Sequence, residues 1–592
     1  MTTQLATQYL DRDYVLKGGM IRHLSTFKYV NAGFWTVKGM QGDDEDALTK
    51  SNGAELFSAT NLGGRVLGLF QVTLNAVVYY FVMANGKIMR VSGATVTDML
   101  TGQAAGYYDG RTLESVFYAV SGTNPNKKIL SSLVVQNVGI AAPTTACTAA
   151  IGIGGAITGD YGYRYTYKNT TTGHESNPSP VSNTITATAD KIDLTGLADS
   201  PDTQVDAKVI YRTTNAGAGL WFRVAEIGGA ITIYTDNTVD DDLAEAVLED
   251  SDVPPQAAYI EIFNGMMAYA GLAAPNRNRV AMSGVLRPEA HDLDNVYDLE
   301  PDEEDSISGM KRFGSALAVY KKRRLFLGSG FSPDEIEFTA TRVREGSLGN
   351  AIIDHESAHF YLSQQGPYVF AGLKEEFFGR PIQDFYKTLD PTALANASAT
   401  SYEPLNQLIW NVQEIGQSDY NAWLIFNTQT KEWTIRDFAS SRLSVYFDSV
   451  GTIKLWLGGV NGLLYNGDIG TGDNGANIAC TVITRGVCLQ YINKQPDLGQ
   501  SYCFRHLEIF YDANGGSAAV TVTVAIDKPD GSYQNVVNVS TGASTFVPTT
   551  GTKARFDLNQ TGRLLFVKLN VSSAEALKIR GIRVQGYGLG RR

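Results

Sequence analysis

The chain has 592 residues, more than one hydrophobic core holds, and its length predicts about three domains. Hydrophobic residues make up 43% and charged residues 19%, the balance of an ordinary soluble globular protein. The formal net charge of −12 at pH 7 argues against general affinity for nucleic acid, because binding a duplex requires a cationic surface.

Two further features of the composition limit the fold and the location of the protein. The 60 glycines and 30 tyrosines favour a turn-rich, all-β structure. No apolar run approaches the ~18 residues that a membrane-spanning helix requires. The first twelve residues also lack the basic start and apolar run of a secretory signal, so we expect no membrane insertion and assembly in the cytoplasm.

Residues 1–50 are predicted to form an extended N-terminal arm. The arm ends in an acidic run of four residues, Asp43, Asp44, Glu45 and Asp46. Such an arm either packs on a neighbour or closes a ring of repeated sheets.

Seven hairpins dominate the middle of the chain. In each of them a short apolar strand meets a turn and returns directly as a second strand, which is the pattern of a β-hairpin. The pairs are 77–82 with 88–91, 116–120 with 129, 260–263 with 266–270, 317–320 with 325–327, 360–362 with 368–370, 423–426 with 433–436 and 454–457 with 463–465. Their spacing predicts a β-propeller of six or seven blades, built from residues 51–142 and 256–470.

An insert at 143–255 separates the second hairpin from the third. It opens with a Thr-, Ala- and Gly-rich linker and ends at Pro254 and Pro255. Tyr163, Tyr165 and Tyr167 alternate along one strand, and further strands are predicted at 209–212, 221–227 and 231–234. Strands of this length over about 100 residues predict a small β-sandwich similar to a fibronectin type III module.

Residues 471–592 are predicted to form a last β-sandwich of jelly-roll type. Strands are expected at 479–484, 502–511, 518–527, 554–558, 564–570 and 578–584. Apolar residues alternate with polar or small ones over 520–526, as in a strand with one buried face. Helical turns are expected only at 243–248 and 289–295.

The string His355-Glu356-Ser357-Ala358-His359 matches the His-Glu-x-x-His pattern of zinc proteases. That chemistry requires a helix, which places both imidazoles on one face. Here the string continues into an alternating strand pattern, and two histidines four residues apart on a strand are separated by about 13 Å. We therefore expect a surface strand and no metal site.

Two kinds of charge cluster are candidate binding sites. The basic run Lys321-Lys322-Arg323-Arg324 is expected to be a solvated turn, with contact to a phosphate or an acidic neighbour as the alternative. The acidic clusters lack the ligand spacing of a calcium loop and are expected to be solvated loops, with weak metal binding as the alternative for the second group. These clusters are Glu300-Pro301-Asp302-Glu303-Glu304-Asp305, and Asp236 with Asp240, Asp241 and Asp242.

No catalytic motif or cofactor site is predicted. Cys147, Cys480, Cys488 and Cys503 form no Cys-x-x-Cys pair and are expected to be reduced, partly buried thiols, with a disulfide or a zinc site in the C-terminal domain as the alternative. A hydrolase would need two carboxylates that converge across a cleft, and the sequence does not pair any. Exposed tryptophans could stack sugars, but in strands they are usually core residues; the candidates are Trp410, Trp433 and Trp456.

Four segments resemble one family of structural proteins. They are the acidic-Ile-x-Gly stretch that runs from Asp305-Ser306-Ile307-Ser308-Gly309 to Tyr320, the Ser363-Gln364-Gln365-Gly366 turn between two strands, the Tyr163-Arg164-Tyr165-Thr166-Tyr167 strand with Glu175-Ser176-Asn177-Pro178-Ser179-Pro180, and the ending Ile579-Arg580-Gly581-Ile582-Arg583-Val584. Together these segments are similar to the tail nozzle (tail tubular protein B type) of short-tailed bacteriophages. They cover about half of the chain discontinuously, and none is a strict signature. The His355–His359 string and the basic turn depart from the family pattern.

The resemblance implies a virion protein without catalytic residues. It implies a homohexameric ring around a channel through which DNA leaves, docked to an adaptor or tail tubular protein and to tail fibres or spikes. The acidic balance fits such a conduit, because a negative wall repels phosphates. Two alternatives remain from the residues themselves: a receptor- or glycan-binding tail protein, and a propeller hydrolase.

Overall fold

A computed structural model describes residues 10–591 of the chain, apart from 21–31, 43–46, 216–219, 247–249, 302–303, 493–494, 497–498, 514–516 and 550. The predicted acidic run at 43–46 therefore lies outside the described residues, as do Asp302 and Glu303 of the other acidic stretch, 300–305. Strands make up nearly all of the regular structure, as predicted. The chain divides into two compact units, one made of residues 1–71, 80–97 and 343–592 and the other of 72–79 and 98–342.

Seven four-stranded antiparallel sheets follow one another through the described part of the chain, and they are the blades of a β-propeller. The first three are β6–β9 (Val66–Leu74, Val77–Ala84, Lys87–Ser92, Thr95–Leu100), β10–β13 (Asp109–Leu113, Val116–Val120, Lys127–Ile129, Val135–Asn137) and β21–β24 (Tyr259–Phe263, Met266–Ala270, Arg279–Gly284, Arg287–Asp298). The next three are β25–β28 (Ile307–Phe313, Ala316–Lys321, Leu325–Ser329, Glu337–Ala340), β29–β32 (Ile353–His355, Ala358–Leu362, Pro367–Phe370, Glu375–Phe377) and β33–β36 (Ala399–Tyr402, Gln407–Val412, Ala422–Asn427, Trp433–Asp437). The seventh is β37–β39 (Ser440–Phe447, Ile453–Gly459, Leu464–Gly467) with β5 (Ala54–Ser58).

The seventh blade is closed by a strand from the other end of the sequence. β5 pairs antiparallel with β39, with Ala54 opposite Gly467 and Ser58 opposite Leu464. Ala54 is fully buried, and the core beneath the blade includes Leu455 and Leu457. Pairing of a near-N-terminal strand with the last blade covers an edge that would otherwise be open.

All seven predicted hairpins are confirmed, because their turns carry a strong local signal. β7 and β8 are joined by Asn85 and Gly86, which have φ values of +49° and +68°. β21 and β22 are joined in the same way by Asn264 and Gly265. Two residues with positive φ form the tight turn whose twist matches a hairpin, and Asn-Gly adopts it readily.

Both expected helical turns are wrong where they can be compared. The segment predicted at 289–295 lies in β24, whose polar residues Asp292 and Asp294 are on the accessible part of the strand. Residues 244–246 of the other segment form β20 (Ala244–Ala246), after a short 3₁₀ turn at Asp240–Asp242. Pairing with β23 decides the structure of 289–295, since strand preference depends more on neighbours than on residue type.

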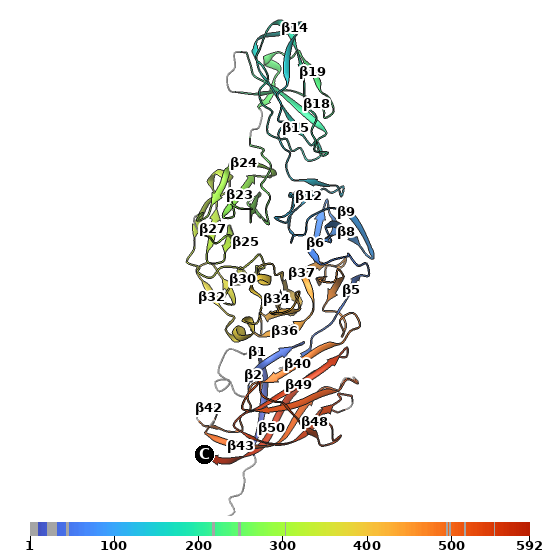
Figure 1. Cartoon of the computed structure of the whole chain (residues 1–592), viewed down its shortest axis with the longest axis vertical. Helices are drawn as coiled ribbons and strands as arrows, with labels where there is room; N and C mark the ends of the chain where they lie inside the picture. The colour runs from blue at the N-terminus through green and yellow to red at the C-terminus, as the bar shows by residue number, and fades with distance from the viewer. Residues whose placement is uncertain are drawn as a thin grey trace, which may run out of the picture. The chain divides into compact units, whose positions relative to one another are not determined.

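The insert is a β-sandwich of two small sheets, as predicted (Figure 1). One sheet contains β14 (Thr148–Tyr161), β16 (Ile185–Thr195) and β19 (Ile233–Asp236). The other contains β15 (Tyr163–Lys168), β17 (Ala207–Arg212), β18 (Phe222–Gly228) and β20. The three alternating tyrosines of β15 are buried in the core between the sheets. β14 begins inside the stretch predicted as a linker.

A serine-rich segment runs alongside β15. Ser176, Ser179 and Ser182 each donate a backbone N–H to a tyrosine carbonyl of β15, and each accepts the N–H of the same tyrosine on its Oγ. The intervening prolines lack an N–H and leave these bonds intact. The segment therefore runs in an extended form along the edge of the insert at β15.

The C-terminal domain is a sandwich of two large sheets (Figure 1, orange to red). One sheet joins β43 (Gln500–Tyr511) to β48 (Lys553–Gly562) and β50 (Lys578–Arg591). The other joins β49 (Leu565–Ser573) to β40 (Ile478–Thr484) and β44 (Val520–Ile526). The six predicted strands are confirmed.

The described strands of the N-terminal arm predicted at 1–50 pair with this sandwich. β1 (Leu10–Met20) pairs with β50, and β4 (Leu48–Lys50), which follows β3 (Met40–Gly42), pairs with the same strand. β2 (Ala32–Lys38) pairs with β40 and, at Lys38, with Ile435 of blade strand β36. Tyr14, Phe34 and Leu48 are buried in the sandwich core, so the apolar residues of the arm explain its position.

Candidate functional site

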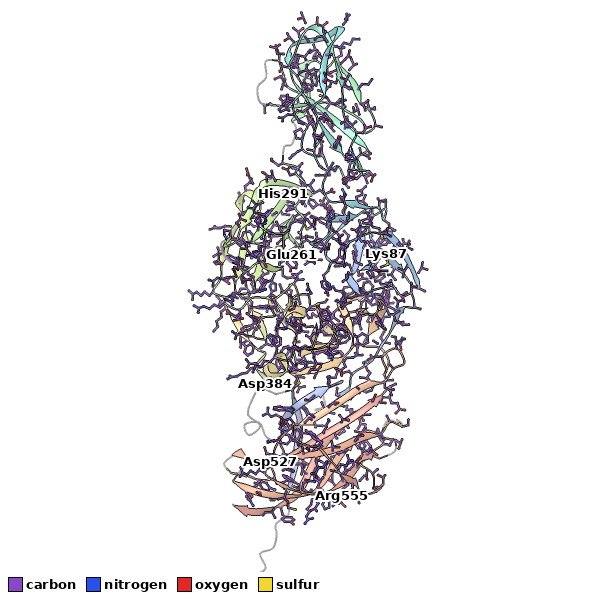
Figure 2. The ribbon with its side chains drawn as sticks, in the orientation of Figure 1. Lys87, Glu261, His291, Asp384, Asp527 and Arg555 are labelled. Carbon is purple, nitrogen blue, oxygen red and sulfur yellow. The ribbon has the colours of Figure 1, made fainter. Side chains whose placement is uncertain are left out.

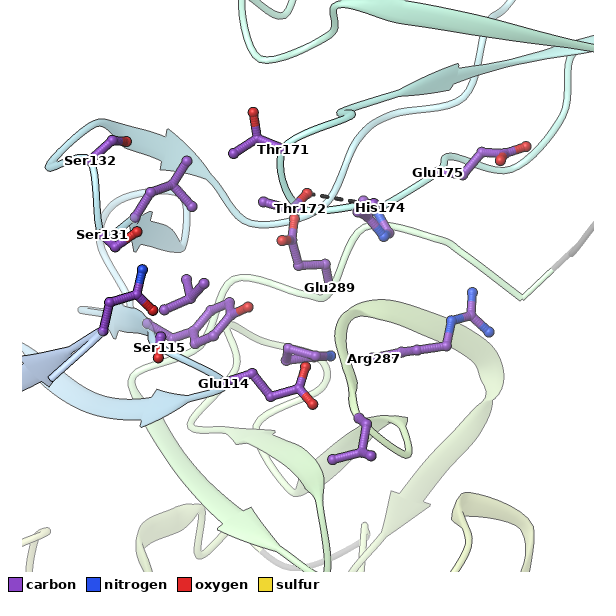
Figure 3. Close-up of a pocket in the computed structure, with 17 residues that line it drawn as sticks. Glu114, Ser115, Ser131, Ser132, Thr171, Thr172, His174, Glu175, Arg287 and Glu289 are labelled. Carbon is purple, nitrogen blue, oxygen red and sulfur yellow. Dashed lines mark hydrogen bonds between the residues drawn. The ribbon is translucent and has the colours of Figure 1, made fainter. Parts of the chain in front are cut away.

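A cavity of about 450 Å³ opens in the second unit between the insert and three blades. We call it the joint cavity. Four groups of residues line it: Asn75 of the β6–β7 turn, the β10–β11 turn with the end of β12, the insert loop 171–175, and the turn into β24 with the start of that strand (Figure 3). Its volume lies in the range of ~300–1,000 Å³ that is usual for small-molecule sites.

A buried ion pair lies beside the joint cavity, and one of its two members, Glu289, lines it. The Nζ of Lys128 donates to Glu289 at 2.5 Å, and the backbone N–H of Gly139 donates to the same carboxylate oxygen at 3.2 Å. The side chains of Lys128 and Glu289 are 0% and 5% exposed. Burial lowers the pKa of Lys128, and Glu289 opposes that shift. Because each charge compensates the other, the pair keeps a polar surface in place beside the cavity.

His174 also lines the joint cavity. Its Nε2 is buried and has no hydrogen-bond partner, while its backbone N–H donates to Thr172 Oγ1 at 3.3 Å. Desolvation, with the nearby cations Lys128 and Arg287, lowers the pKa of His174 to about 3. The imidazole is therefore neutral at physiological pH and can either donate or accept one more hydrogen bond.

A second cluster lies on the first strands of consecutive blades. Arg111 of β10 donates two hydrogen bonds to Glu261 of β21, at 2.7 and 3.0 Å, and a third to Asp109 at 2.8 Å. Glu261 is labelled in Figure 2. Burial works against the charged form of Glu261, but Arg111 holds the pKa of this carboxyl below its usual value. The bidentate pair ties the two blades together.

The His355–His359 string forms a hairpin and not a helix. Glu356 and Ser357 are its two turn residues, with φ values of +49° and +63°, and His355 lies on β29 while His359 lies on β30. The prediction of a strand is confirmed, but a single continuous strand is wrong. His359 is fully buried, which also corrects its expected surface position. His355 contacts Ser401 through its Nδ1 at 3.3 Å.

The basic run contacts acidic neighbours, the alternative considered for it. Asp305 accepts the backbone N–H groups of Lys322 and Arg323 at 3.2 and 2.9 Å, and Glu300 lies 3.6 Å from Arg324. Lys321 is fully buried, so the expectation of a solvated turn is wrong for this residue. The acidic stretch and the basic run therefore hold one another in the same blade.

The acidic group in the insert is also structural. Asp236 is fully buried and accepts hydrogen bonds from Arg212 at 2.6 Å and from Tyr163 at 2.8 Å. Asp240 pairs with the same arginine at 2.9 Å. The expectation of a solvated loop is wrong for Asp236, whereas Asp240 is partly exposed and Asp241 and Asp242 are exposed. In the described ranges, no three His, Cys, Asp or Glu side chains are grouped as metal ligands.

The cysteines and tryptophans lie in the cores. All four cysteines are buried and free, so the predicted reduced thiols are confirmed. Trp410, Trp433 and Trp456 are at most 1% exposed, and the core interpretation of these residues is confirmed. They are not available to stack a sugar on the surface.

The joint cavity was not predicted from the sequence. Its residues come from segments far apart in the sequence, from Asn75 to Glu289, and none of those segments carries a motif. The one sequence signal that could have indicated the cavity is His174. It lies in a Thr- and Gly-rich loop of the insert, where a turn does not require a histidine.

None of the helices in the described ranges has the length and apolar character needed to cross a membrane. No protein-family model matches the chain, and no curated protein matches it.

The similar solved structures are distant. The WD40 domain of Pan2 from Neurospora crassa has 7% identity and a TM-score of 0.27, and the match covers 70% of this chain and 95% of that one. Hsv2 of Kluyveromyces lactis has 8% identity and a TM-score of 0.23, with 63% and 98% covered. An exo-β-1,3-galactanase from Phanerochaete chrysosporium has 12% identity and a TM-score of 0.18, with 82% and 96% covered. At these scores the similarity carries no argument about activity; the propeller is established by the seven sheets described above.

Proposed function

We propose that the chain is a non-enzymatic structural protein of a bacteriophage tail. In this proposal it forms a ring, most simply a hexamer, that serves as the tail nozzle. DNA passes through the lumen during genome ejection without specific binding. The adaptor or tail tubular protein docks at one end, and fibres or spikes dock on the outer surfaces.

The observation that carries the proposal is the way the N-terminal segment fastens the first unit. β1 and β4 pair with the C-terminal strand β50, β2 bridges the sandwich and blade strand β36, and β5 closes the last blade. A force applied to β1 or to β50 is therefore carried by a sheet. A protein that must keep its form while DNA moves past it needs this kind of closure.

Buried charges at the same junction support a structural role. Arg436 of β36 pairs with Asp473, and Lys50 donates to the carbonyl of Thr471. The Arg436 guanidinium also lies 4.8 Å from the ring centre of Trp423. These cations hold the blade and the sandwich in register.

The Arg111–Glu261 pair bears on the hydrolase alternative. Glycoside hydrolysis uses one carboxyl that keeps its proton near neutral pH and a second that does not. Glu261 has a lowered pKa and is held by two hydrogen bonds from Arg111, while Asp109 takes the third. The carboxylates of Glu261 and Asp109 thus both accept hydrogen bonds from Arg111. This arrangement favours a scaffold over an acid–base pair.

The segments that carry the family resemblance occupy structural positions. Asp305 fixes the basic turn, 363–366 form the turn between β30 and β31, and 579–584 lie in β50. A resemblance confined to such positions favours a shared architecture and not a shared reaction.

Electron microscopy of the purified chain, with and without an adaptor protein, tests the proposal. We expect closed rings with a mass of six times the 64.1 kDa of one chain by native mass spectrometry. We also expect the chain in purified virions, at the tail. A monomer under every assembly condition together with absence from particles would reject the proposal.

Receptor or glycan binding is the second candidate function. The buried tryptophans do not support it, but the joint cavity does. Binding of isolated chain to a glycan array, in the absence of rings, would favour this function over the nozzle.

A further inference from the structure

We propose that the joint cavity binds a small neutral saccharide. The inference concerns the second unit alone and holds whether or not the chain forms a ring. It is based on the walls of the cavity, on one unpartnered buried atom and on the way the charged groups are already used.

The cavity has an apolar floor and a polar rim. Leu130, Tyr118 and Pro288 are buried beneath it. Its rim carries hydroxyl groups from both sides: Thr171 and Thr172 from the insert, and Ser115, Ser131 and Ser132 from the blade (Figure 3). A sugar ring has one apolar face and a girdle of hydroxyl groups, so it matches a site of this kind.

His174 supplies the atom that requires a ligand or an ordered water molecule. Its Nε2 is enclosed without a partner, whereas buried polar side-chain atoms are usually hydrogen-bonded. The ring is neutral, so it can bond a hydroxyl group without demanding an opposite charge. An apolar ligand would leave this nitrogen unpaired.

Three of the four charged residues that line the cavity, Glu175, Arg287 and Glu289, have protein partners. Glu289 accepts from Lys128 and from Gly139, and Arg287 donates to Ser251 Oγ at 2.7 Å. Glu175 accepts from Thr166 at 2.6 Å and from Tyr211 at 2.5 Å. The hydrogen-bonding groups left for a ligand are therefore mostly uncharged.

The balance of charge excludes anionic ligands. Lys128 compensates Glu289, which leaves the carboxylates of Glu114 and Glu175 against the single guanidinium of Arg287 among the lining residues. A phosphate or a uronic acid placed here would be repelled. Tyr118 keeps its proton, because burial and the neighbouring Glu289 raise the pKa of its phenol, so it is a donor to a sugar hydroxyl group.

Saturation-transfer NMR on the full chain tests the inference. The probes are glucose, galactose, mannose, N-acetylglucosamine and lactose, with glucose 6-phosphate and glucuronate as charged analogues. We expect at least one neutral sugar to bind, and each charged analogue to bind at least tenfold more weakly than its neutral parent.

Three variants locate the binding. Ser132→Trp places a bulky ring at the exposed rim, where folding is not at risk, and is expected to abolish binding. His174→Ala is expected to weaken binding about tenfold. His506→Ala, on the C-terminal sandwich, is the matched control and is expected to leave affinity unchanged.

Two results would overturn the inference. One is that no neutral sugar in the panel binds the wild-type chain. The other is that a sugar binds with equal affinity to wild type and to Ser132→Trp, which would place the site elsewhere. Unchanged thermal unfolding of each variant separates loss of binding from loss of fold.

Discussion

Arg212 and Asp236 in the insert are both 0% exposed and lie 2.6 Å apart. The guanidinium also lies 4.6 Å from the ring centre of Tyr161, and its other end pairs with Asp240. Arg212→Met would leave Asp236 buried without its cation, and we expect the free energy of unfolding of the insert to fall by about 3–5 kcal/mol. Hydrogen exchange of the β17 amides measures this change.

The matched control is Arg223→Met, because the pair between Arg223 and Glu226 is 33% and 30% exposed. We expect less than ~1 kcal/mol for this change. A double variant that also carries Asp236→Asn should recover part of the loss, since it removes the stranded charge. Equal exchange rates in Arg212→Met and Arg223→Met would contradict the account of the buried pair.

His174 makes the joint between the insert and the blades sensitive to acid. Its pKa is about 3 in the folded protein, against 6.5 for an ordinary histidine, because of burial and then of Lys128 and Arg287. The unfolded chain therefore binds the proton first, and stability is lost as pH falls from about 6.5 towards 3, by at most about 1.4 kcal/mol per pH unit. Above pH 6.5 this contribution is fully present.

Hydrogen exchange of residues 169–176 at pH 7.5 and 5.5, corrected for intrinsic rates, measures the effect. His174→Gln should remove the extra opening at pH 5.5, and His506→Gln on the C-terminal sandwich should not. The same pH dependence in wild type and His174→Gln would assign the acid sensitivity to another group near the cavity, which contains Glu114, Glu175 and Glu289.

Closure of the last blade depends on a close backbone approach at the start of β5. A Cβ atom on Gly53 would lie 2.0 Å from the carbonyl oxygen of Gly472. Both segments form hydrogen bonds there, since Gly53 donates to Gly470 and Ala54 donates to Gly472. We expect Gly53→Ala to lower the stability of the first unit by about 1–3 kcal/mol, because the backbone must shift. Thermal unfolding followed by circular dichroism measures it.

Gly581→Ala in β50 is the control for that experiment. Its added Cβ would meet only a ring carbon of Phe510 at 3.6 Å, which is ordinary contact. We expect a change within about 1 kcal/mol, in either direction, from the loss of glycine flexibility. A Gly53→Ala protein as stable as Gly581→Ala would show that the blade closes in another way.

The sequence predicted elements well where the determinant is local. Asn85-Gly86 and Asn264-Gly265 are turn residues by type, so their hairpins could be recognised. The Glu356-Ser357 turn contains no residue that favours positive φ, and the hairpin between the two histidines was therefore predicted as one strand. The segment at 289–295 has helical composition but is a strand, because β23 supplies its hydrogen bonds.

Contacts between distant segments could not be predicted. The sequence gives no sign that the acidic run at 300–305 contacts the basic run at 321–324. The fold nevertheless brings Asp305 to the backbone of Arg323. The N-terminal segment was predicted as an arm because nothing in its sequence indicates that it pairs with β50. The joint cavity could not be predicted for the same reason, since its walls come together only after the insert has packed on the blades.

The insert enters and leaves the propeller at neighbouring points. A Cβ on Gly139 would lie 3.0 Å from Cδ of Pro254 and 3.1 Å from Cα of Val253. We therefore expect a chain in which two glycines replace residues 141–252 to fold, with a thermal midpoint within about 5 °C of wild type. Circular dichroism and native mass spectrometry check the fold and the assembly.

The excised chain also separates the two proposals. A chain that loses saccharide binding but still forms rings would fit both proposals. The cavity requires the insert loop, whereas ring formation does not require it. An insoluble product would show that the blades depend on the insert for their core, contrary to the expectation drawn from Gly139 and Pro254.

The pairing of β1 with β50 sets an order of events during synthesis. On a ribosome that adds ~5–20 residues per second, the first strand waits about half a minute to two minutes for its partner to be made. Blades and insert can form in that interval, while the leading segment stays without its final neighbours. A message broken before codon 578 would thus yield a product in which β1, β4 and β43 lack the strand that pairs with all three of them.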